Sequence, residues 1–329
     1  KTIWKGYFFI DNLQLTSISK DKFNLIPSKP IAYWISENMF KCFKSKSTSD
    51  YAKCCKGLDT GNNDLFLRLW FEVDLANTSI NENNGWWIPY NKGGAFRKWY
   101  GNNFYLVNWK NEGSVLSAFK GSNIRNRCYH FKAGVTWSTT TGSSFSSRSS
   151  PEGFLFDSKG CMAFPNEGIS IQMLLAEMNA KTYNYFLDII TPTLDFNPGP
   201  VGKTPFVVFE ENKIIDMVDE CCRIAKDEWD DYEMSWDFSK HPFVKIADSL
   251  KNEDIRIDEV YTKWSVQYKE RFNKIRTNEE YINRYFIELY NLQNEISPDV
   301  PEYETTIRKV DWVREVKSLI SYAVGCMFG

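Results

Sequence analysis

The chain of 329 residues is long enough to bury a sizeable hydrophobic core, with 43% hydrophobic and 25% charged residues. This composition excludes a largely disordered chain, and without any apolar run of about 18 residues the sequence does not indicate a membrane span. The formal net charge of −2 excludes a basic field over the whole chain, so nucleic-acid binding would require a local basic patch.

The first part of the chain is predicted to be rich in β-structure. Aromatic residues reach 16%, and such flat side chains pack well on pleated sheets. Short apolar runs at residues 4–10 and 31–35 indicate strands within an entry segment, residues 1–50. Further strand candidates, separated by turns rich in glycine and asparagine, are residues 65–74, 86–88, 105–109, 129–131, 134–137 and 153–156.

The middle of the chain changes from hydroxyl-rich to helical. Residues 136–150 are nearly all serine and threonine, which is too polar for a core, so a loop is predicted there. Apolar residues then recur at helical spacing in 169–179 and 183–190, and a short strand is predicted at 205–209.

Helical periodicity dominates the chain from residue 210 onward. Helices are predicted at residues 214–222, 255–275, 279–296 and 307–328. The sequence therefore predicts an α+β fold, in which a β-rich domain at residues 51–210 precedes a mainly helical C-terminal region at residues 211–329.

Charge is distributed unevenly along the sequence. Residues 96–148 contain eight lysines and arginines against a single acid, Glu112, whereas residues 210–237 contain eleven acids. We therefore predict that the middle of the chain forms a basic face and that the helices after it form an acidic, solvated layer.

No nucleotide-binding loop is predicted. The sequence GPVGKT at residues 199–204 is similar to the end of a phosphate-binding loop, but Asn197 stands where that motif requires glycine. Pro205 follows directly, where the phosphate-binding helix should begin. A plain turn is the favoured interpretation.

No metal or nuclease site is predicted either. Asp157 and Lys159 have the spacing of a restriction-type nuclease pair but lack a well-placed partner acid, so a solvated turn is favoured. His130 and His241 are far apart in sequence, and neither belongs to a metal-binding motif. Eight cysteines without CxxC spacing indicate reduced thiols and a cytoplasmic protein.

Amino-methyltransferase chemistry is also missing from the motifs of this chain. Such an enzyme needs a glycine-rich cofactor loop and an Asn/Asp-Pro-Pro-Tyr/Phe tetrad, and the sequence 197–199 is only a distant approach to the tetrad. We expect this chain to have no catalytic residues, to hold no cofactor and to be inactive alone.

A binding surface is the remaining candidate. Residues 92–100 combine three cations with a double glycine and two large aromatics, Trp99 and Tyr100, which suits phosphate contact, although a hairpin with a solvated tip is an equal alternative. Arg125 and Arg127 lie two apart and would share one side of an extended segment, where arginine can grip guanine. The candidate DNA-contacting residues are Lys92, Arg97, Lys98, Trp99, Tyr100, Arg125, Arg127, Lys132, Ser138, Thr139 and Arg148.

Several segments together resemble one known family. These are KGLDTGNNDLFLRLWFEVD at residues 56–74, GWWIPYNKGGAFRKWYGNNFYLVNW at 85–109, SNIRNRCYHFKAGVTWS at 122–138, GFLFDSKGCMAF at 153–164 and KSLISYAVGCMFG at 317–329. Their order is similar to that of the BREX phage-defence, PglX-type adenine-specific DNA methyltransferases, downstream of the catalytic tetrad. The hydroxyl-rich residues 139–150 match only loosely.

The resemblance implies a role for this chain within a longer polypeptide. The parent enzyme would transfer a methyl group from S-adenosylmethionine to adenine N6, with the base swung out of the duplex. This chain would bind double-stranded DNA beside the upstream methylase domain. The alternative is a protein-interaction module that docks other defence-system subunits and reads no bases.

Overall fold

The computed structural model describes residues 26–27, 35–80, 85–191, 193, 195–250 and 254–328. The strand predicted at residues 4–10 lies outside the described residues, as does all but the last residue of the one predicted at 31–35. The described chain contains both helices and sheets, so the predicted α+β class is confirmed.

Two four-stranded sheets form the β-structure. The first sheet is antiparallel throughout, in the order β1 (Ala52–Cys55), β8 (Met162–Pro165), β5 (Gly134–Trp137) and β6 (Ser147–Ser150). The second has the order β2 (Leu67–Leu69), β4 (Tyr105–Asn108), β3 (Trp87–Asn91) and β7 (Leu155–Phe156). In the second sheet β3 and β7 run parallel, and the other neighbours run antiparallel.

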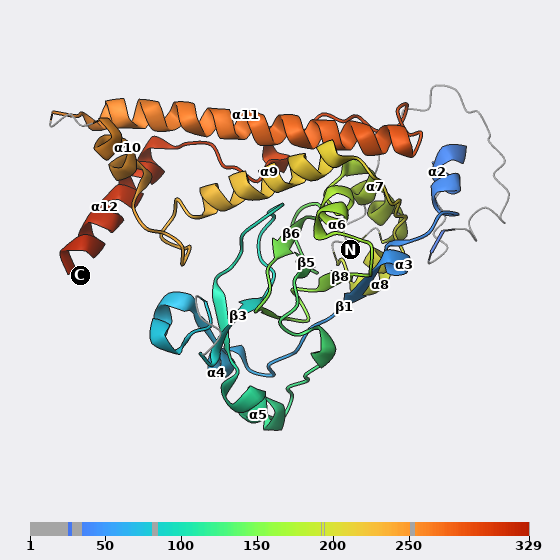
Figure 1. Cartoon of the computed structure of the whole chain (residues 1–329), viewed down its shortest axis with the longest axis horizontal. Helices are drawn as coiled ribbons and strands as arrows, with labels where there is room; N and C mark the ends of the chain where they lie inside the picture. The colour runs from blue at the N-terminus through green and yellow to red at the C-terminus, as the bar shows by residue number, and fades with distance from the viewer. Residues whose placement is uncertain are drawn as a thin grey trace, which may run out of the picture.

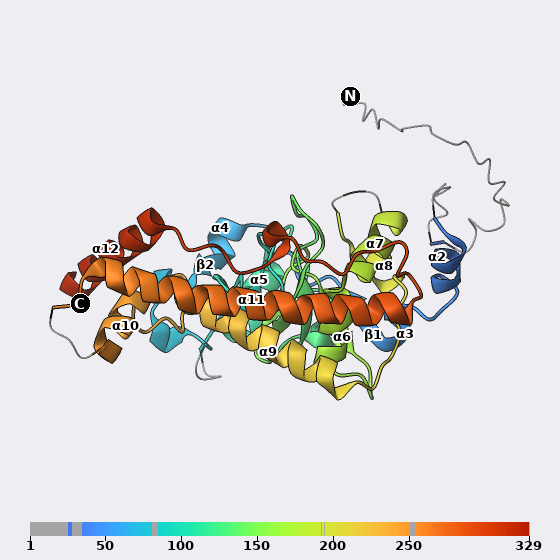
Figure 2. The ribbon, with the colours of Figure 1, turned by 90° about the horizontal axis from the view of Figure 1, so that it is seen from above.

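Helices cover one side of these sheets. Figure 1 shows α11 running along one edge of the molecule with α9 beneath it, and the second sheet with α4 and α5 lying farthest from α11. The helices are α2 (Glu37–Cys42), α3 (Thr48–Tyr51), α4 (Asn63–Phe66), α5 (Lys110–Ala118), α6 (Ile171–Met178), α7 (Lys181–Ile190), α8 (Pro198–Gly202), α9 (Asn212–Trp229), α10 (Pro242–Leu250), α11 (Ile257–Leu289) and α12 (Trp312–Phe328). Figure 2 shows α11 lying lengthwise over α9, with α12 at the C-terminal end.

The main hydrophobic core joins the first sheet to the helices. In α9 the buried positions Ile214, Val218, Cys221 and Ala225 recur at helical spacing, which gives the helix one apolar side. Helix α6 packs between α9 and strands β5, β6 and β8, so it connects the two layers. The second sheet has a separate, smaller core that includes Trp109.

Several predicted elements are confirmed. Strand β5 has the predicted bounds, and β4 ends one residue before the prediction. Helices α6 and α7 occupy the predicted segments to within two residues. The helices predicted at 255–275 and 279–296 are one continuous helix, α11, because no glycine or proline interrupts residues 257–289.

Other predicted elements are wrong. Within 65–74 only Leu67–Leu69 forms a strand, because α4 precedes it and a 3-10 turn, Trp70–Glu72, follows it. The strand predicted at 129–131 is replaced by a 3-10 turn, Arg127–Tyr129. No strand forms at 205–209. This segment makes isolated backbone hydrogen bonds, such as the one from Phe206 N to Lys46 O (3.0 Å).

The hydroxyl-rich stretch is only partly a loop. Its end, Ser147–Ser150, is strand β6, and Ser147 is fully buried. The Ser147 backbone N–H and hydroxyl both donate to Asn179 Oδ1, at 2.9 and 3.1 Å. Buried hydroxyls are stable when their hydrogen bonds are made, so polarity alone did not exclude a core strand here.

A buried carboxyl couples helix α6 to the end of α11. Glu177 accepts hydrogen bonds from the Val207 backbone N–H and from the Tyr290 hydroxyl. Burial raises the pKa of Glu177 from 4.5 to about 8. The folded protein therefore holds a proton on Glu177 at pH values where the unfolded chain has lost it.

We predict a pH-dependent stability from this group. The free energy of unfolding should fall as pH rises from 4.5 to about 8, by up to about 1.4 kcal/mol per pH unit. Glu177→Gln removes the titration and should flatten the profile, whereas Glu167→Gln, at an exposed position, should not. Urea unfolding between pH 5 and 8 measures this, and equal slopes for the wild type and Glu177→Gln would contradict it.

Candidate nucleic-acid interface

The segment at residues 92–100 is a tightly folded loop between β3 and β4. Gly93 and Gly94 have φ values of +87° and +147°, which side chains rarely allow. Trp99 also has a positive φ, 72°, and is held there by backbone hydrogen bonds with β6. Its N–H donates to Ser147 O (2.9 Å), and its carbonyl accepts from Ser149 N (2.8 Å).

Arg97 points from this loop into the helical layer. Its guanidinium forms an ion pair with Glu228 of α9 at 2.5 Å, and the exposed fractions of the two side chains are 8% and 2%. The same guanidinium donates to Tyr100 O (2.7 Å) and Ala225 O (3.1 Å). It also lies over the ring of Trp229, so its planar face and its donors are both used.

Lys98 and Trp99 share one carboxylate of α11. The Lys98 ammonium lies 3.0 Å from Glu279 Oε2, and the Trp99 indole N–H donates to Glu279 Oε1 at 2.7 Å. The Lys98 backbone N–H donates to the Thr306 hydroxyl (2.8 Å). Both carboxylate oxygens of a buried acid are therefore satisfied, as a buried charge requires.

Six of the predicted DNA-contacting residues are buried, so the prediction that their side chains lie on the DNA-facing surface needs correction. They are Arg97, Lys98, Trp99, Ser138, Thr139 and Arg148. Each pair or hydrogen bond that they make is internal, so they connect the sheets to the helices and to one another. The acidic layer is correspondingly not fully solvated, because Glu228 and Glu279 are buried within the structure.

Arg148 is the most enclosed of these cations. It is 1% exposed and donates to Arg97 O at 3.2 Å, while its Nε has no partner among the described residues. Burial, with a smaller contribution from the charge of Arg97, lowers the pKa of Arg148 from 12.5 to about 10.

Tyr100 and Lys92 lie at intermediate depth. The Tyr100 ring is half-buried with the Lys226 ammonium 5.3 Å from its centroid, and burial raises the pKa of its hydroxyl. Lys92 forms an ion pair with Asp157 at 2.6 Å. Asp157 also accepts from the Tyr90 hydroxyl (2.8 Å) and the Lys159 N–H (2.6 Å). It is only 2% exposed, so the turn that it supports is not the solvated turn that was predicted.

The other predicted cations reach the surface. Arg127 is exposed, donates to Ser117 Oγ (3.0 Å) and lies 5.7 Å from the Trp109 ring centroid. Lys132 is exposed beside the Tyr129 ring. Arg125 is partly exposed and forms an ion pair with Asp59 at 2.8 Å.

Arg125 and Arg127 do not lie on an extended segment as predicted. Asn126 between them has a left-handed φ of 52°, and a 3-10 turn begins at Arg127. Arg125 therefore contacts Asp59, whereas Arg127 contacts α5 and Trp109.

Two further exposed lysines belong to the same part of the molecule. Lys110 begins α5 and lies over the Trp86 ring (5.1 Å), and Lys120 follows the end of that helix. Only the charge excess at residues 96–148 indicated them in the sequence, because no motif contains them. We define the basic surface as Lys110, Lys120, Arg125, Arg127 and Lys132.

Lys110 and Lys120 lie at the two ends of α5, and Arg125, Arg127 and Lys132 lie in or beside the 3-10 turn that follows. Figure 1 shows α5 on the side of the molecule away from α11. Among the described residues, no group of three or more histidine, cysteine or acidic side chains is arranged to hold a metal ion. In the same ranges no helix is both long and apolar enough to cross a bilayer. The geometry of this surface suits a polyanion that is contacted over several points.

Comparison with known proteins gives two relatives of interest, although no family model matches the chain. An adenine-specific methyltransferase PglX from Lacticaseibacillus casei (strain Zhang) is 35% identical over 339 residues, covering 97% of this chain. An adenine-specific methyltransferase BrxX from Escherichia coli O9:H4 (strain HS) is 32% identical over 335 residues, covering 94%. The chain is homologous to a segment of adenine-specific methyltransferases. It spans 28% and 26% of the lengths of these relatives.

The buried pair at α11 gives a testable prediction about stability. Glu279→Ala leaves the Lys98 ammonium and the Trp99 indole N–H buried without an acceptor, which should lower the free energy of unfolding by about 3–5 kcal/mol. Asp227→Ala, which removes an exposed pair with Arg223, should change it by no more than about 0.5 kcal/mol. Urea unfolding measures both, and a similar small effect for the two variants would contradict the structural role of Glu279.

Proposed function

We propose that this chain recognises specific double-stranded DNA sequences for adenine-N6 methylation in a BREX-type phage-defence system. The observation that carries the proposal is the basic surface, five exposed or partly exposed cations on and after α5, in the part of the fold away from α11. Homology to a segment of adenine-specific methyltransferases supports the link to methylation. The methyl donor, S-adenosylmethionine, and the catalytic residues would be supplied by a methylase domain upstream in the same polypeptide.

The side chains of the basic surface suit two different kinds of DNA contact. The lysines Lys110, Lys120 and Lys132 are exposed point charges that suit phosphate oxygens. Arg127 presents a planar guanidinium beside Trp109, and arginine can donate two hydrogen bonds to a guanine edge in the major groove. A duplex held at these points would leave the target adenine free to swing into the methylase domain.

A second candidate function is protein docking, and helix α12 favours it. The large exposed apolar side chains of this helix are Trp312, Val313, Ile320, Val324, Met327 and Phe328. Met327 and Phe328 are 81% and 88% exposed, and exposed apolar surface of this kind often contacts another protein. The methylase domain or another defence-system subunit would be the partner.

DNA titration at several salt concentrations tests the first candidate. Binding of a duplex should weaken with salt, and Lys120→Ala combined with Lys132→Ala should lower the slope of log K against log salt by about two, because each phosphate contact contributes about 0.9. The control pair, Arg223→Ala with Lys274→Ala, removes two exposed cations that contact Glu220 and should leave the slope unchanged.

Two outcomes would count against DNA recognition. The first is the absence of duplex binding at low salt. The second is an equal loss of binding in the test and control variants, which would mean that total charge and not the basic surface governs the interaction.

A further inference from the structure

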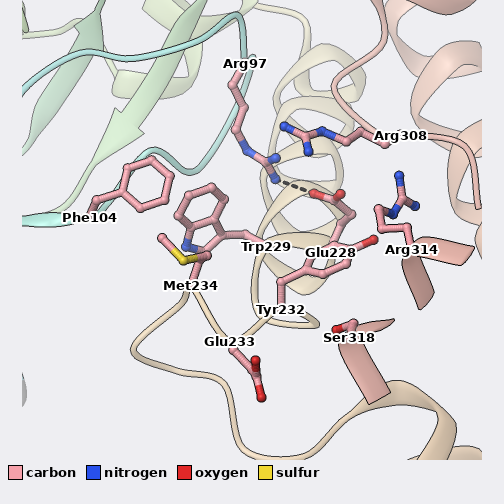
Figure 3. Close-up of a pocket in the computed structure, with 10 residues that line it drawn as sticks. All are labelled: Arg97, Phe104, Glu228, Trp229, Tyr232, Glu233, Met234, Arg308, Arg314 and Ser318. Atoms are coloured by element: carbon pink, nitrogen blue, oxygen red, sulfur yellow. Dashed lines mark hydrogen bonds and ion pairs between the residues drawn. The ribbon is translucent and has the colours of Figure 1, made fainter. Parts of the chain in front are cut away.

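A cavity of about 350 Å³ lies beside Arg97 of the loop, and none of the basic-surface residues lines it. It forms where residues 97–104 meet the end of α9 and the start of α12 (Figure 3). Its walls include three aromatic side chains, Phe104, Trp229 and Tyr232. A volume of this size is at the lower end of the range for small-molecule sites, which is roughly 300–1,000 Å³.

Three arginines surround this cavity. Arg97 is already paired with Glu228, and Arg314 is paired with Glu315 at 2.6 Å. Arg308 is exposed, and no acid among the described residues forms an ion pair with it. Figure 3 shows the guanidinium groups of Arg97 and Arg308 directed toward one another, an arrangement that an anion between them would stabilise.

One polar group in the cavity wall has no partner. The Tyr232 hydroxyl is buried and makes no hydrogen bond to any described residue. Figure 3 shows it on the side of Tyr232 that faces Arg314. A buried hydroxyl is normally hydrogen-bonded, so a ligand oxygen or nitrogen would supply the missing partner.

We propose that this cavity binds a nucleoside monophosphate. Arg308 would hold the phosphate beside Arg97, since a guanidinium fork matches its oxygens, while Arg314 stays paired with Glu315. The base would pack against Phe104 and Trp229, and the Tyr232 hydroxyl would hydrogen-bond to the ligand. Two carboxylates line the cavity. Glu228 is neutralised by Arg97 at 2.5 Å, and Glu233 accepts from the Ser321 hydroxyl at 2.8 Å and points away from Arg308 in Figure 3.

The site is independent of the proposed DNA surface. It contains none of the five basic-surface residues, and its ligand is a free nucleotide that can be tested without a duplex. The cavity is lined by Arg97 and Glu228, the ion pair that joins the loop at residues 92–100 to helix α9.

Calorimetric titration of the 329-residue chain with AMP, adenosine and inorganic phosphate tests the proposal. AMP should bind to one site per chain, and it should bind more tightly than adenosine or inorganic phosphate. Arg308→Ala should weaken AMP at least tenfold, about the effect of one charge-assisted contact, and Tyr232→Phe should weaken it by a smaller factor. The control is Arg284→Ala, an exposed arginine of α11 outside the cavity, which should leave AMP binding unchanged.

Three results would overturn the proposal. They are no saturable AMP binding at millimolar concentration, equal affinity for AMP and for adenosine or inorganic phosphate, and equal AMP affinity in the wild type and Arg308→Ala. Circular dichroism of each variant verifies that its fold is retained, so that lost binding is not confused with unfolding.

Discussion

The arrangement of this protein depends on two buried ion pairs between one loop and two helices. Arg97 meets Glu228 of α9, and Lys98 meets Glu279 of α11. A buried charge is costly unless it is paired and hydrogen-bonded, so the loop has few alternative positions once the helices are in place. The pairs therefore fix how the sheets sit on the helical layer. The cavity beside Arg97 and Glu228 depends on the same arrangement.

The same pairs explain where reasoning from the sequence failed. Cations beside glycines and aromatics look like an exposed binding loop, because the sequence gives no sign of their acidic partners. Glu228 lies 131 residues after Arg97, and Glu279 lies 181 residues after Lys98. Glu228 is also one of eleven acids spread over residues 210–237, and such a concentration of acids is typical of a solvated helix face. No spacing rule distinguishes Glu228 and Asp231, the two that are buried, from the others.

Local patterns predicted the elements that are determined locally. Strand β5 and helices α6, α7 and α9 follow from the spacing of apolar residues, because each buries one side against a neighbour. Strand β6 was missed because its buried serines are satisfied by residues brought close only by the fold, Ser147 by Asn179 and Ser150 by Asn91. Of the candidate DNA contacts, Arg125, Arg127 and Lys132 reach the surface, and their part in DNA binding stays a prediction.

The buried pairs also define what can be exchanged between related proteins. A loop of residues 92–100 moved into another member without matching acids on its two helices would bring two cations into a site with no carboxylates. The natural unit of exchange is then the loop together with α9 and α11, which are separated from it by more than a hundred residues of sequence. Chimaeras cut near residue 210 would separate partners that the folded protein keeps in contact.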